Sequence, residues 1–452
     1  MPRFGVWTAQ RACRRRRGRA GGLAALTAVL TAFALAACTS PTGTPGSTGT
    51  PGPGESATNG GAATSSSPTP TTPPPPPPLA WGPTEADVQG WIDEAAGLDL
   101  AEAAGQVIIA RYSGTDPATP ADLVRKLDLG GIVLFAGNIA SLDQVIATGE
   151  AIQAAGEDLG RDWPTIVSAD DEGGRVQRLS GARGPWTTFP SFSHAGDAPA
   201  KVVREAMAAM AIEQRASGLN TDFAPDADVT IGPADPTIGD RSASEDPDKA
   251  AAAVAAAVEG FTAGGVLSSL KHFPGHGALT VDSHKALPVQ EDTTAELEER
   301  DLVPFRAGIE AGAPMVMMGH IDVEAWDPGV PASMSAAAYD YLREELGFTG
   351  VAITDGLEMG ALDAIGDAGD IAVTAIGAGA DLLLGPTDPA LARQALIDAV
   401  EAGTLDRDRL NEAAGRVMAM MDWQTHLASE AGPVSPADVG SAKEAAAALA
   451  GY

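Results

Sequence analysis

Residues 265–284 read GVLSSLKHFPGHGALTVDSH, an apolar run followed at once by charged and polar side chains. The run has the composition of a buried strand, so Lys271 and His272 would stand at the strand's end. The proline and glycines that follow suit a loop that carries Asp282 and His284 back over whatever binds there. Because this segment holds three of the chain's six histidines, we interpret it as an active-site loop.

Similar apolar runs alternate with alanine-rich amphipathic stretches from Trp81 onward. The runs expected to be strands number eight: 107–110, 131–135, 165–169, 221–225, 266–270, 315–318, 350–354 and 381–384. Segments such as 201–217, 246–263 and 335–346 have the composition and length of helices. Eight alternations predict an α/β fold of the (β/α)8 TIM-barrel type, with functional residues where strands end. A doubly wound open sheet would alternate similarly with fewer strands. No Gly-x-Gly-x-x-Gly follows an early strand, which disfavours a dinucleotide fold.

The N-terminus has the parts of an export signal. Seven arginines within the first 19 residues precede an apolar stretch, residues 20–37, that ends in small residues directly before Cys38. These small residues resemble a bacterial lipobox, which implies that residues 1–37 are a lipoprotein signal peptide and that Cys38 is acylated. We therefore expect a protein exported and lipid-anchored to the outer face of the bacterial cell membrane. An ordinary signal peptide with an incidental cysteine, or an uncleaved anchor, is the alternative.

Residues 38–79 consist almost entirely of Ser, Thr, Pro, Gly and Ala, and we expect a disordered tether there. At roughly 3 Å per residue in polyproline geometry, it would reach on the order of 100 Å. That reach suits a target in the cell wall, although a neutral spacer of any length fits the composition equally well. The remaining chain divides into one catalytic domain, 80–427, and a peripheral tail, 428–452.

The formal net charge of −31 would become about −38 without the seven N-terminal arginines. So acidic a chain argues against a nucleic-acid partner and against electrostatic docking on anionic lipid, which leaves the N-terminal lipid as the only membrane contact. Cys13 would leave with the signal, so the mature protein would keep one cysteine and no disulfide. We expect a monomer.

Charged residues follow several of the predicted strands. They occur in the segment 170–175, at Asp226 and Asp228, at Lys271 and His272, at His320, and at Asp355. A single aspartate at such a place is as easily a helix cap or a turn residue. Capping does not call for lysine, histidine and aspartate at one rim, so the set indicates a site.

These segments resemble glycoside hydrolase family 3 β-N-acetylglucosaminidases. The signature is residues 271–284, with its lysine–histidine pair and its aspartate–histidine dyad. Residues 129–135 (LGGIVLF), 170–178 (DDEGGRVQR) and 347–359, which contain Asp355, also match. The similarity spans about residues 98–421, and it implies a single-domain TIM barrel.

The resemblance implies a retaining mechanism in which Asp355 is the nucleophile. His284 matches the acid/base of this subfamily, and Asp282 would orient its imidazole. Only 67 residues follow Gly385, too few for a second domain that could supply an acid, which fits a histidine on the strand-five loop. No cofactor and no metal are implied.

The resemblance further implies that five residues bind an N-acetylglucosamine unit. They are Asp170, Arg178, Arg241, Lys271 and His272. A structural ion pair is the alternative role for Arg178 and for Arg241. His320 matches a recurrent position without an assigned step, and His276 could equally support the loop. Two departures stand out: Ala243 follows the arginine–serine pair in place of an aromatic residue, and Gly356 follows the nucleophile in place of aspartate or alanine.

The predicted function is an exo-acting β-N-acetylhexosaminidase that releases terminal β-linked N-acetylglucosamine from cell-wall glycans or muropeptides. A β-N-acetylglucosaminide phosphorylase is an open alternative, because a histidine acid/base does not repel phosphate as a carboxylate would. A non-catalytic sugar-binding lipoprotein is another. A metal-dependent barrel hydrolase is disfavoured, because Ala110-Arg111-Tyr112 stands where a His-x-His motif would follow the first strand.

Overall fold

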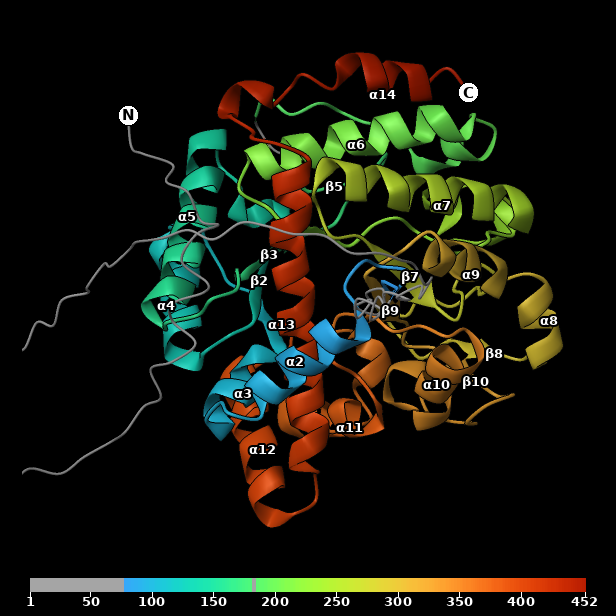
Figure 1. The fold of residues 1–452 in the computed structure, drawn as a ribbon. Coiled ribbons are helices and arrows are strands. Elements are labelled where there is room, and N and C mark those ends of the chain that lie inside the picture. The colour runs from blue at the N-terminus through green and yellow to red at the C-terminus, as the bar shows by residue number, and fades with distance from the viewer. Residues whose placement is uncertain (1–76, 181–183) are drawn as a thin grey trace, which may run out of the picture. The chain divides into compact units, whose positions relative to one another are not determined.

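The computed structural model describes residues 77–452 except 181–183. The predicted signal peptide, Cys38 and nearly all of the predicted tether lie outside the described residues. The α-helices are α2 (Glu85–Ala95), α3 (Leu100–Gln106), α4 (Ala118–Leu127), α5 (Leu142–Asp158), α6 (Ala200–Ala216), α7 (Pro247–Gly264), α8 (Thr294–Glu299), α9 (Leu302–Glu310), α10 (Ala336–Asp340), α11 (Ala368–Ala378), α12 (Pro389–Ala402), α13 (Arg407–Glu430) and α14 (Lys443–Leu449). Figure 1 shows them around a central group of strands.

The central strands are parallel and form a curled arrangement. Five of them make one sheet in the order β12 (Leu383–Leu384), β1 (Ile108–Ala110), β2 (Gly131–Leu134), β3 (Ile166–Ala169) and β6 (Thr221–Asp222). A second sheet has the order β11 (Val351–Thr354), β9 (Met315–Met318) and β7 (Ser269–Phe273). Two small pairs lie apart: the hairpin β4 (Asp171–Gly173) and β5 (Val176–Gln177), and β8 (Val289–Gln290) with β10 (Asp322–Val323).

The prediction of a (β/α)8 barrel is confirmed in part. A strand occurs in each of the eight predicted runs, but the strands form sheets of five and three instead of one continuous sheet. Isolated bridges, Thr221 to Leu267 and Ile353 to Leu382, join the sheet edges. The ladders are short there for local reasons. Pro225 has no N–H to donate, and the Asp381 side chain instead of a strand carbonyl accepts from Ala352 N at 3.0 Å.

The fifth predicted strand is shifted along the chain. The prediction placed it at 266–270 with Lys271 and His272 beyond its end, whereas β7 runs from Ser269 to Phe273 and contains both residues. All five residues of β7 are buried. A strand continues through two basic residues only if they find partners inside the protein, and both do so, as described below.

The helices are terminated by local sequence signals, as α7 illustrates. Asp246 caps its N-terminus by accepting from the backbone amides of Asp248 and Lys249, and Pro247 occupies its first turn. Gly265 ends the helix in a left-handed conformation with φ of 81°. The helix packs between α6 and α9 (Figure 1), which fixes the start of β7.

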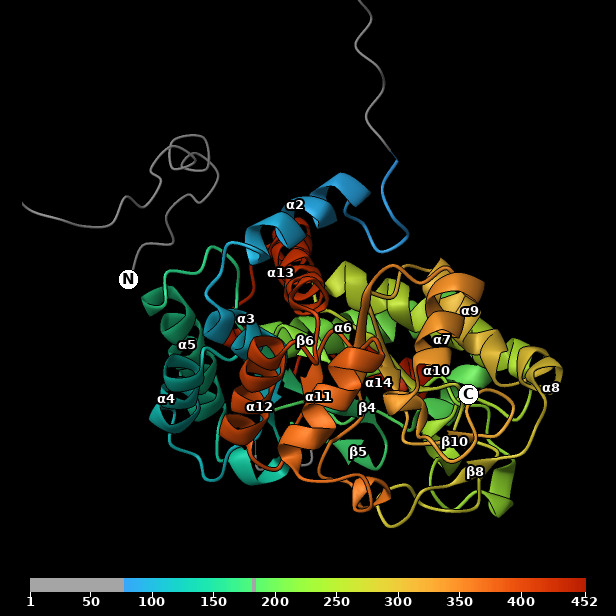
Figure 2. The same cartoon turned by 90° about the horizontal axis from the view of Figure 1, so that it is seen from below.

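The N-terminal ends of the parallel strands are covered by α2 and α13. Buried side chains of the strands, such as Ile109 and Met315, form one apolar cluster with Val417, Met420 and Met421 of α13. In Figure 2, α2 and α13 lie on one side of the strands, and the β4–β5 and β8–β10 pairs lie on the other. The end that carries these small pairs is therefore free to hold a site.

The segment predicted as a peripheral tail, 428–452, contains the end of α13 and all of α14, so the predicted boundary at 427 falls inside a helix. Ala446 and Leu449 of α14 are buried, and α14 packs on α6. The amide of Ala442 donates to Glu213 Oε1 at 2.9 Å. Among residues 77–180 and 184–452, no helix is long and apolar enough to cross a membrane.

Candidate active site

A pocket of about 180 Å³ lies at the carboxyl ends of the parallel strands. Its polar lining residues are Arg111, Asp170, Glu172, Arg178, Thr237, Arg241, Lys271, His272, His276, Ser283, His284, Asp355 and Glu358. Drug-sized ligands usually occupy sites of roughly 300–1,000 Å³. This pocket is therefore suited to one small polar unit, such as a single sugar ring.

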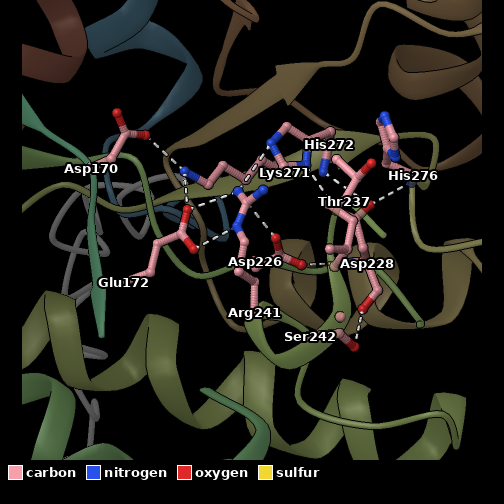
Figure 3. A network of polar contacts seen from close by, with 12 residues as sticks. Asp170, Glu172, Asp226, Asp228, Thr237, Arg241, Ser242, Lys271, His272 and His276 are labelled. Carbon is pink, nitrogen blue, oxygen red and sulfur yellow. Dashed lines mark hydrogen bonds and ion pairs between the residues drawn. The ribbon is translucent and has the colours of Figure 1, made fainter. Parts of the chain in front are cut away.

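Lys271 lies at the centre of a buried group of charges (Figure 3). Its Nζ donates to Asp170 Oδ1 at 2.8 Å and lies 2.6 Å from Glu172 Oε1. Burial acts to lower the pKa of Lys271, but the two carboxylates outweigh burial and raise it. The ammonium group therefore stays charged and holds Asp170 at the edge of the pocket.

Arg241 binds Glu172 through two parallel hydrogen bonds. Its Nε and its second guanidinium nitrogen each lie 2.9 Å from a Glu172 oxygen. Burial acts to raise the pKa of Glu172, but Arg241 and Lys271 outweigh it and lower that pKa. Glu172 thus serves both cations as a shared, fully ionised anchor. Arg241 also lies 3.4 Å from Asp226 Oδ2.

Asp228 fixes the backbone and the ring of His272. Its Oδ2 lies 2.8 Å from His272 Nδ1, and its Oδ1 accepts from the backbone amides of His272 at 3.2 Å and His276 at 2.6 Å. An ionised carboxylate only accepts, so Nδ1 carries the hydrogen, and Nε2 is directed to Arg241, 3.4 Å away. Burial acts to raise the pKa of Asp228, but His272 and His276 lower it to about 2.

Asp226, Asp228 and His272 are close enough together, within 4.8 Å, to be considered as a metal site. Their other contacts do not fit one. Both Asp228 oxygens are already engaged by His272 and His276, and a guanidinium nitrogen of Arg241 lies 3.4 Å from Asp226 and from His272 Nε2. A cation at this place would face a fixed positive charge.

Asp355 follows β11 and lines the same pocket. Its Oδ1 accepts from the amide of Gly356 at 2.7 Å. Burial acts to raise the pKa of Asp355, but the nearby histidines and the Gly356 amide outweigh it, and the pKa is lowered. His320 supports this turn from behind: its Nε2 donates to the Gly356 carbonyl at 2.9 Å, and its Nδ1 pairs with Ser333 Oγ at 2.7 Å. Burial lowers the pKa of His320, which keeps this imidazole neutral.

The loop after β7 carries Asp282 and His284. Asp282 Oδ1 lies 2.9 Å from His284 Nδ1 and accepts from the His284 amide at 3.0 Å, while its Oδ2 pairs with Lys285. Burial acts to raise the pKa of Asp282, but Lys285 and His284 lower it to about 2. The His284 side chain is 65% exposed, so its imidazole borders the pocket and remains open to solvent.

Two contacts hold this loop over the pocket. His276 Nε2 lies 3.1 Å from Ser283 Oγ, and both side chains are buried. The amides of Gly360 and Ala361 donate to the carbonyls of His284 and Ser283, each at 3.2 Å. The part of the loop that bears His284 is therefore tied to His276, three residues after β7, and to the segment after Asp355.

The structure brings the predicted site residues together. Asp170, Arg178, Arg241, Lys271 and His272 line one pocket with Asp355 and His284, and Asp282 holds His284 from outside the lining. Arg178 lies 3.9 Å from Asp170 and over the Phe135 ring. Their roles remain predictions.

Sequence reasoning missed three contributors. Glu172 belongs to the motif at residues 170–178, but its role as an anchor depends on Arg241 and Lys271, which lie about 70 and 100 positions away in the sequence. Asp228 was recognised as charged, without a role. Glu358, three residues after Asp355, lines the pocket and pairs with Arg111. The sequence feature that could have identified Glu358 as a site residue is its position only three residues after the candidate nucleophile.

Comparison with known proteins shows which family the chain resembles. A family model described as the glycosyl hydrolase family 3 N terminal domain matches residues 100–420. The beta-hexosaminidase A of Pseudoalteromonas piscicida is 33% identical over 332 residues, which cover 67% of this chain and 55% of that protein. The beta-hexosaminidase of Stenotrophomonas maltophilia (strain R551-3) is 36% identical over 330 residues, which cover 71% of this chain and 94% of that protein. The chain thus spans about half the length of the first relative and nearly all of the second.

Among solved structures, a glycoside hydrolase family 3 beta-N-acetylglucosaminidase from Paenibacillus sp. str. FPU-7 superimposes with a TM-score of 0.72 and 33% identity. The match covers 78% of this chain and 68% of that one. The similarity therefore includes the fold as well as the sequence motifs.

Proposed function

This chain belongs to glycosyl hydrolase family 3, and we propose that it is an exo-acting, retaining β-N-acetylhexosaminidase. The observation that carries the proposal is the small pocket that Asp355, His284 and five polar sugar-binding candidates line together. Val133, Met317 and Leu384 line the pocket and belong to the buried apolar cluster between the strands, so the pocket ends at the packed core, which favours one terminal sugar over a chain that passes through. The substrate class is terminal β-linked N-acetylglucosamine.

Asp355 is the nucleophile in this proposal. Its lowered pKa keeps the carboxylate ionised at neutral pH, and the Gly356 amide fixes one oxygen. The carboxylate attacks the anomeric carbon as the glycosidic bond breaks, which gives a glycosyl-Asp355 ester. Water then cleaves the ester, and two inversions leave the anomeric configuration retained.

His284 serves as acid and then as base. It gives a proton to the departing oxygen in the first step and takes one from the attacking water in the second. Asp282 accepts from Nδ1, which directs Nε2 toward the substrate and stabilises the imidazolium form. The exposure of His284 suits a group that exchanges protons with water in each cycle.

The charged residues around Lys271 hold the sugar. Asp170 and Arg178 offer an acceptor and donors at the pocket edge, and Lys271 and His272 stand beside them. Glu172 holds Lys271 and Asp228 holds His272, so these two side chains keep their positions without a ligand. Such preorganised charges confer specificity for hydroxyl and acetamido groups.

The setting of the enzyme is also part of the proposal. We infer that Cys38 is acylated after export and that a tether lets the domain act on cell-wall glycans or muropeptides at the outer face of the membrane. We further infer that the bridges between β6 and β7 and between β11 and β12 complete an eight-stranded barrel.

The test is turnover of aryl β-N-acetylglucosaminide and aryl β-glucoside, with and without phosphate. A soluble form should begin at residue 77, because Leu79 packs against the domain's apolar cluster. Selective turnover of the acetamido sugar is expected, with free N-acetylglucosamine as product. The sugar 1-phosphate would indicate a phosphorylase, and binding without turnover would indicate a sugar-binding protein.

Asp355→Ala should lower kcat by roughly 10⁴-fold or more, because the covalent step loses its nucleophile. Azide should then rescue turnover of an activated aryl glycoside by taking the place of the carboxylate. The matched control is Asp363→Ala, an exposed aspartate in the same loop. Retention of near-normal activity by Asp355→Ala would overturn the assignment.

A further inference from the structure

The side of the pocket formed by β11, β12 and β1 carries charges of its own. Arg111 follows β1 and Glu358 follows β11, and both line the pocket. In the strand order, β12 and β1 lie at the edge of the five-stranded sheet opposite β6, the strand that leads to Asp226 and Asp228, and β9 separates β11 from β7, the strand that carries Lys271. Arg111 and Glu358 therefore face a bound sugar from a different side than the Lys271 group.

Within the part of the chain that the structure describes, two contacts fix Arg111 and leave other N–H groups of its guanidinium free. One guanidinium nitrogen pairs with Glu358 Oε1, and the guanidinium carbon lies 4.6 Å from the centre of the Phe135 ring. The side chains of Arg111 and Glu358 are 40% and 28% exposed. The remaining N–H groups of Arg111 are thus available to a ligand in the pocket.

Glu358 has one acceptor that is not used within residues 77–180 and 184–452. Its Oε2 is buried and has no hydrogen-bond partner among the described residues. Burial also raises the pKa of Glu358, although the backbone amide of Glu358 itself and, to a smaller extent, Arg111 act in the opposite direction. An unpartnered carboxylate oxygen is costly to bury, and a pocket is where a substrate donor can compensate for it.

Two glycines make the space for this carboxylate. A Cβ added to Gly356 would lie 2.7 Å from Glu358 Oε2, and one added to Gly385 would lie 3.2 Å from it. Gly356 is also the position where this sequence departs from the aspartate or alanine expected after the nucleophile. The departure has a physical explanation, because a larger residue would displace Glu358.

We propose that Arg111 and Glu358 are specificity-determining residues that bind hydroxyl groups of the terminal sugar, the carboxylate as acceptor and the guanidinium as donor. The inference rests on the proposed function and adds a second polar wall to its site. Neighbouring hydroxyls of a pyranose ring match an adjacent donor and acceptor. The ion pair keeps the two side chains in place before the sugar arrives.

The experiment compares kcat/KM of wild type and Glu358→Ala on aryl β-N-acetylglucosaminide and its 3-, 4- and 6-deoxy analogues. Loss of a charged hydrogen bond should cost about 10- to 100-fold on the parent sugar. On the one analogue that lacks the bound hydroxyl, the two enzymes should differ less than about threefold. Glu401→Gln, an exposed glutamate on α12, is the matched control.

An equal loss of kcat/KM on the parent sugar and on all three analogues would overturn the proposal. An ion pair that only stabilises the fold makes no contact with a substrate hydroxyl, so its loss would not depend on which hydroxyl is missing. If the wild type turns over no glycoside, the proposed function fails. Calorimetric binding of N-acetylglucosamine and the same deoxy sugars then makes the same comparison for Glu358.

A second variant tests the packing. Gly356→Ala should lower kcat/KM about as much as Glu358→Ala, because the added Cβ moves the carboxylate away. The double variant should be no worse than Glu358→Ala alone. Additive losses would mean that Gly356 acts through the Asp355 turn and does not serve to seat Glu358.

Discussion

The strand β7 and the loop after it each carry a histidine bonded through Nδ1 to an aspartate. His272 lies 2.8 Å from Asp228, and His284 lies 2.9 Å from Asp282. The first pair is buried, with side chains 10% and 0% exposed, whereas the second is open, with side chains 65% and 26% exposed. The two pairs have the same type of hydrogen bond but different surroundings. We therefore expect the difference in burial to determine their different roles.

The pairs also differ in what they connect. Asp228 comes from the segment after β6, and it binds two backbone amides as well as the His272 ring. It therefore ties two strands together and cannot move without breaking buried bonds. Asp282 is two residues from His284, and its remaining oxygen pairs with the exposed Lys285. That dyad is a local unit whose two members come from one loop, so it depends on the contacts that hold this loop over the pocket.

The largest difference should appear on unfolding. Asp228→Asn places an amide opposite two backbone N–H groups in a buried site, and we expect it to lower the free energy of unfolding by about 3–5 kcal/mol. Asp282→Asn breaks the same kind of pair at the surface and should cost about 0–1 kcal/mol. Urea unfolding of both variants measures the contrast. Equal losses would show that burial does not separate the pairs.

The Asp228 effect should also depend on pH. Its folded-state pKa of about 2 lies below the ordinary value near 3.9, so the ionised form is favoured in the native state. That stabilisation is fully present above about pH 4 and is lost as the pH falls through 2. The gap in stability between wild type and Asp228→Asn should therefore narrow between pH 4 and pH 2. A gap that stays constant would contradict the shifted pKa.

His284→Ala should slow catalysis more for a leaving group whose oxygen is more basic. We expect kcat/KM to fall about 10²- to 10⁴-fold for a sugar or alkyl leaving group, because its oxygen must be protonated as it departs. A dinitrophenyl group departs as a stable anion, so the loss there should be only a few-fold. A series of aryl glycosides of graded acidity measures this. Equal losses across the series would remove His284 from the acid role.

Much of this molecule could be predicted from patterns within the sequence. Eight apolar runs located the strands, because strands of a covered parallel sheet are buried on both faces. The limits of β7 were wrong, because the strand continues through Lys271, whose burial is possible only with Asp170 and Glu172 beside it. No local pattern contains those partners, which lie about a hundred residues away in the sequence.

The same reason explains the predicted and the missed site residues. Asp282 and His284 were found together because their contact is local, and family motifs supplied Asp355 and Arg178. Glu172 and Asp228 act by holding other side chains, and that role appears only when distant strands meet. The space for Glu358 depends on Gly356 and Gly385, and an absence of side chains has no sequence signature until the packing is known.

The smallest expected effect concerns the link between the two pairs. His276, whose amide binds Asp228, holds Ser283 through Nε2 at 3.1 Å, and Ser283 precedes His284. Ser283→Ala removes this bond and should lower kcat/KM about 2- to 10-fold for a poor leaving group, because a neutral hydrogen bond contributes about 0.5–1.5 kcal/mol. Thr280→Ala, in an exposed part of the same loop, should have no effect.

The double variant decides what Ser283 does. If the buried pair positions the exposed one through Ser283, then Ser283→Ala should cost nothing further once His284 is alanine, because there is no imidazole left to place. If the two losses multiply, Ser283 supports the pocket independently of His284. In that case the two aspartate–histidine pairs act independently, although both histidines belong to the segment 272–284. The hydrogen bonds from the Gly360 and Ala361 amides would then position His284.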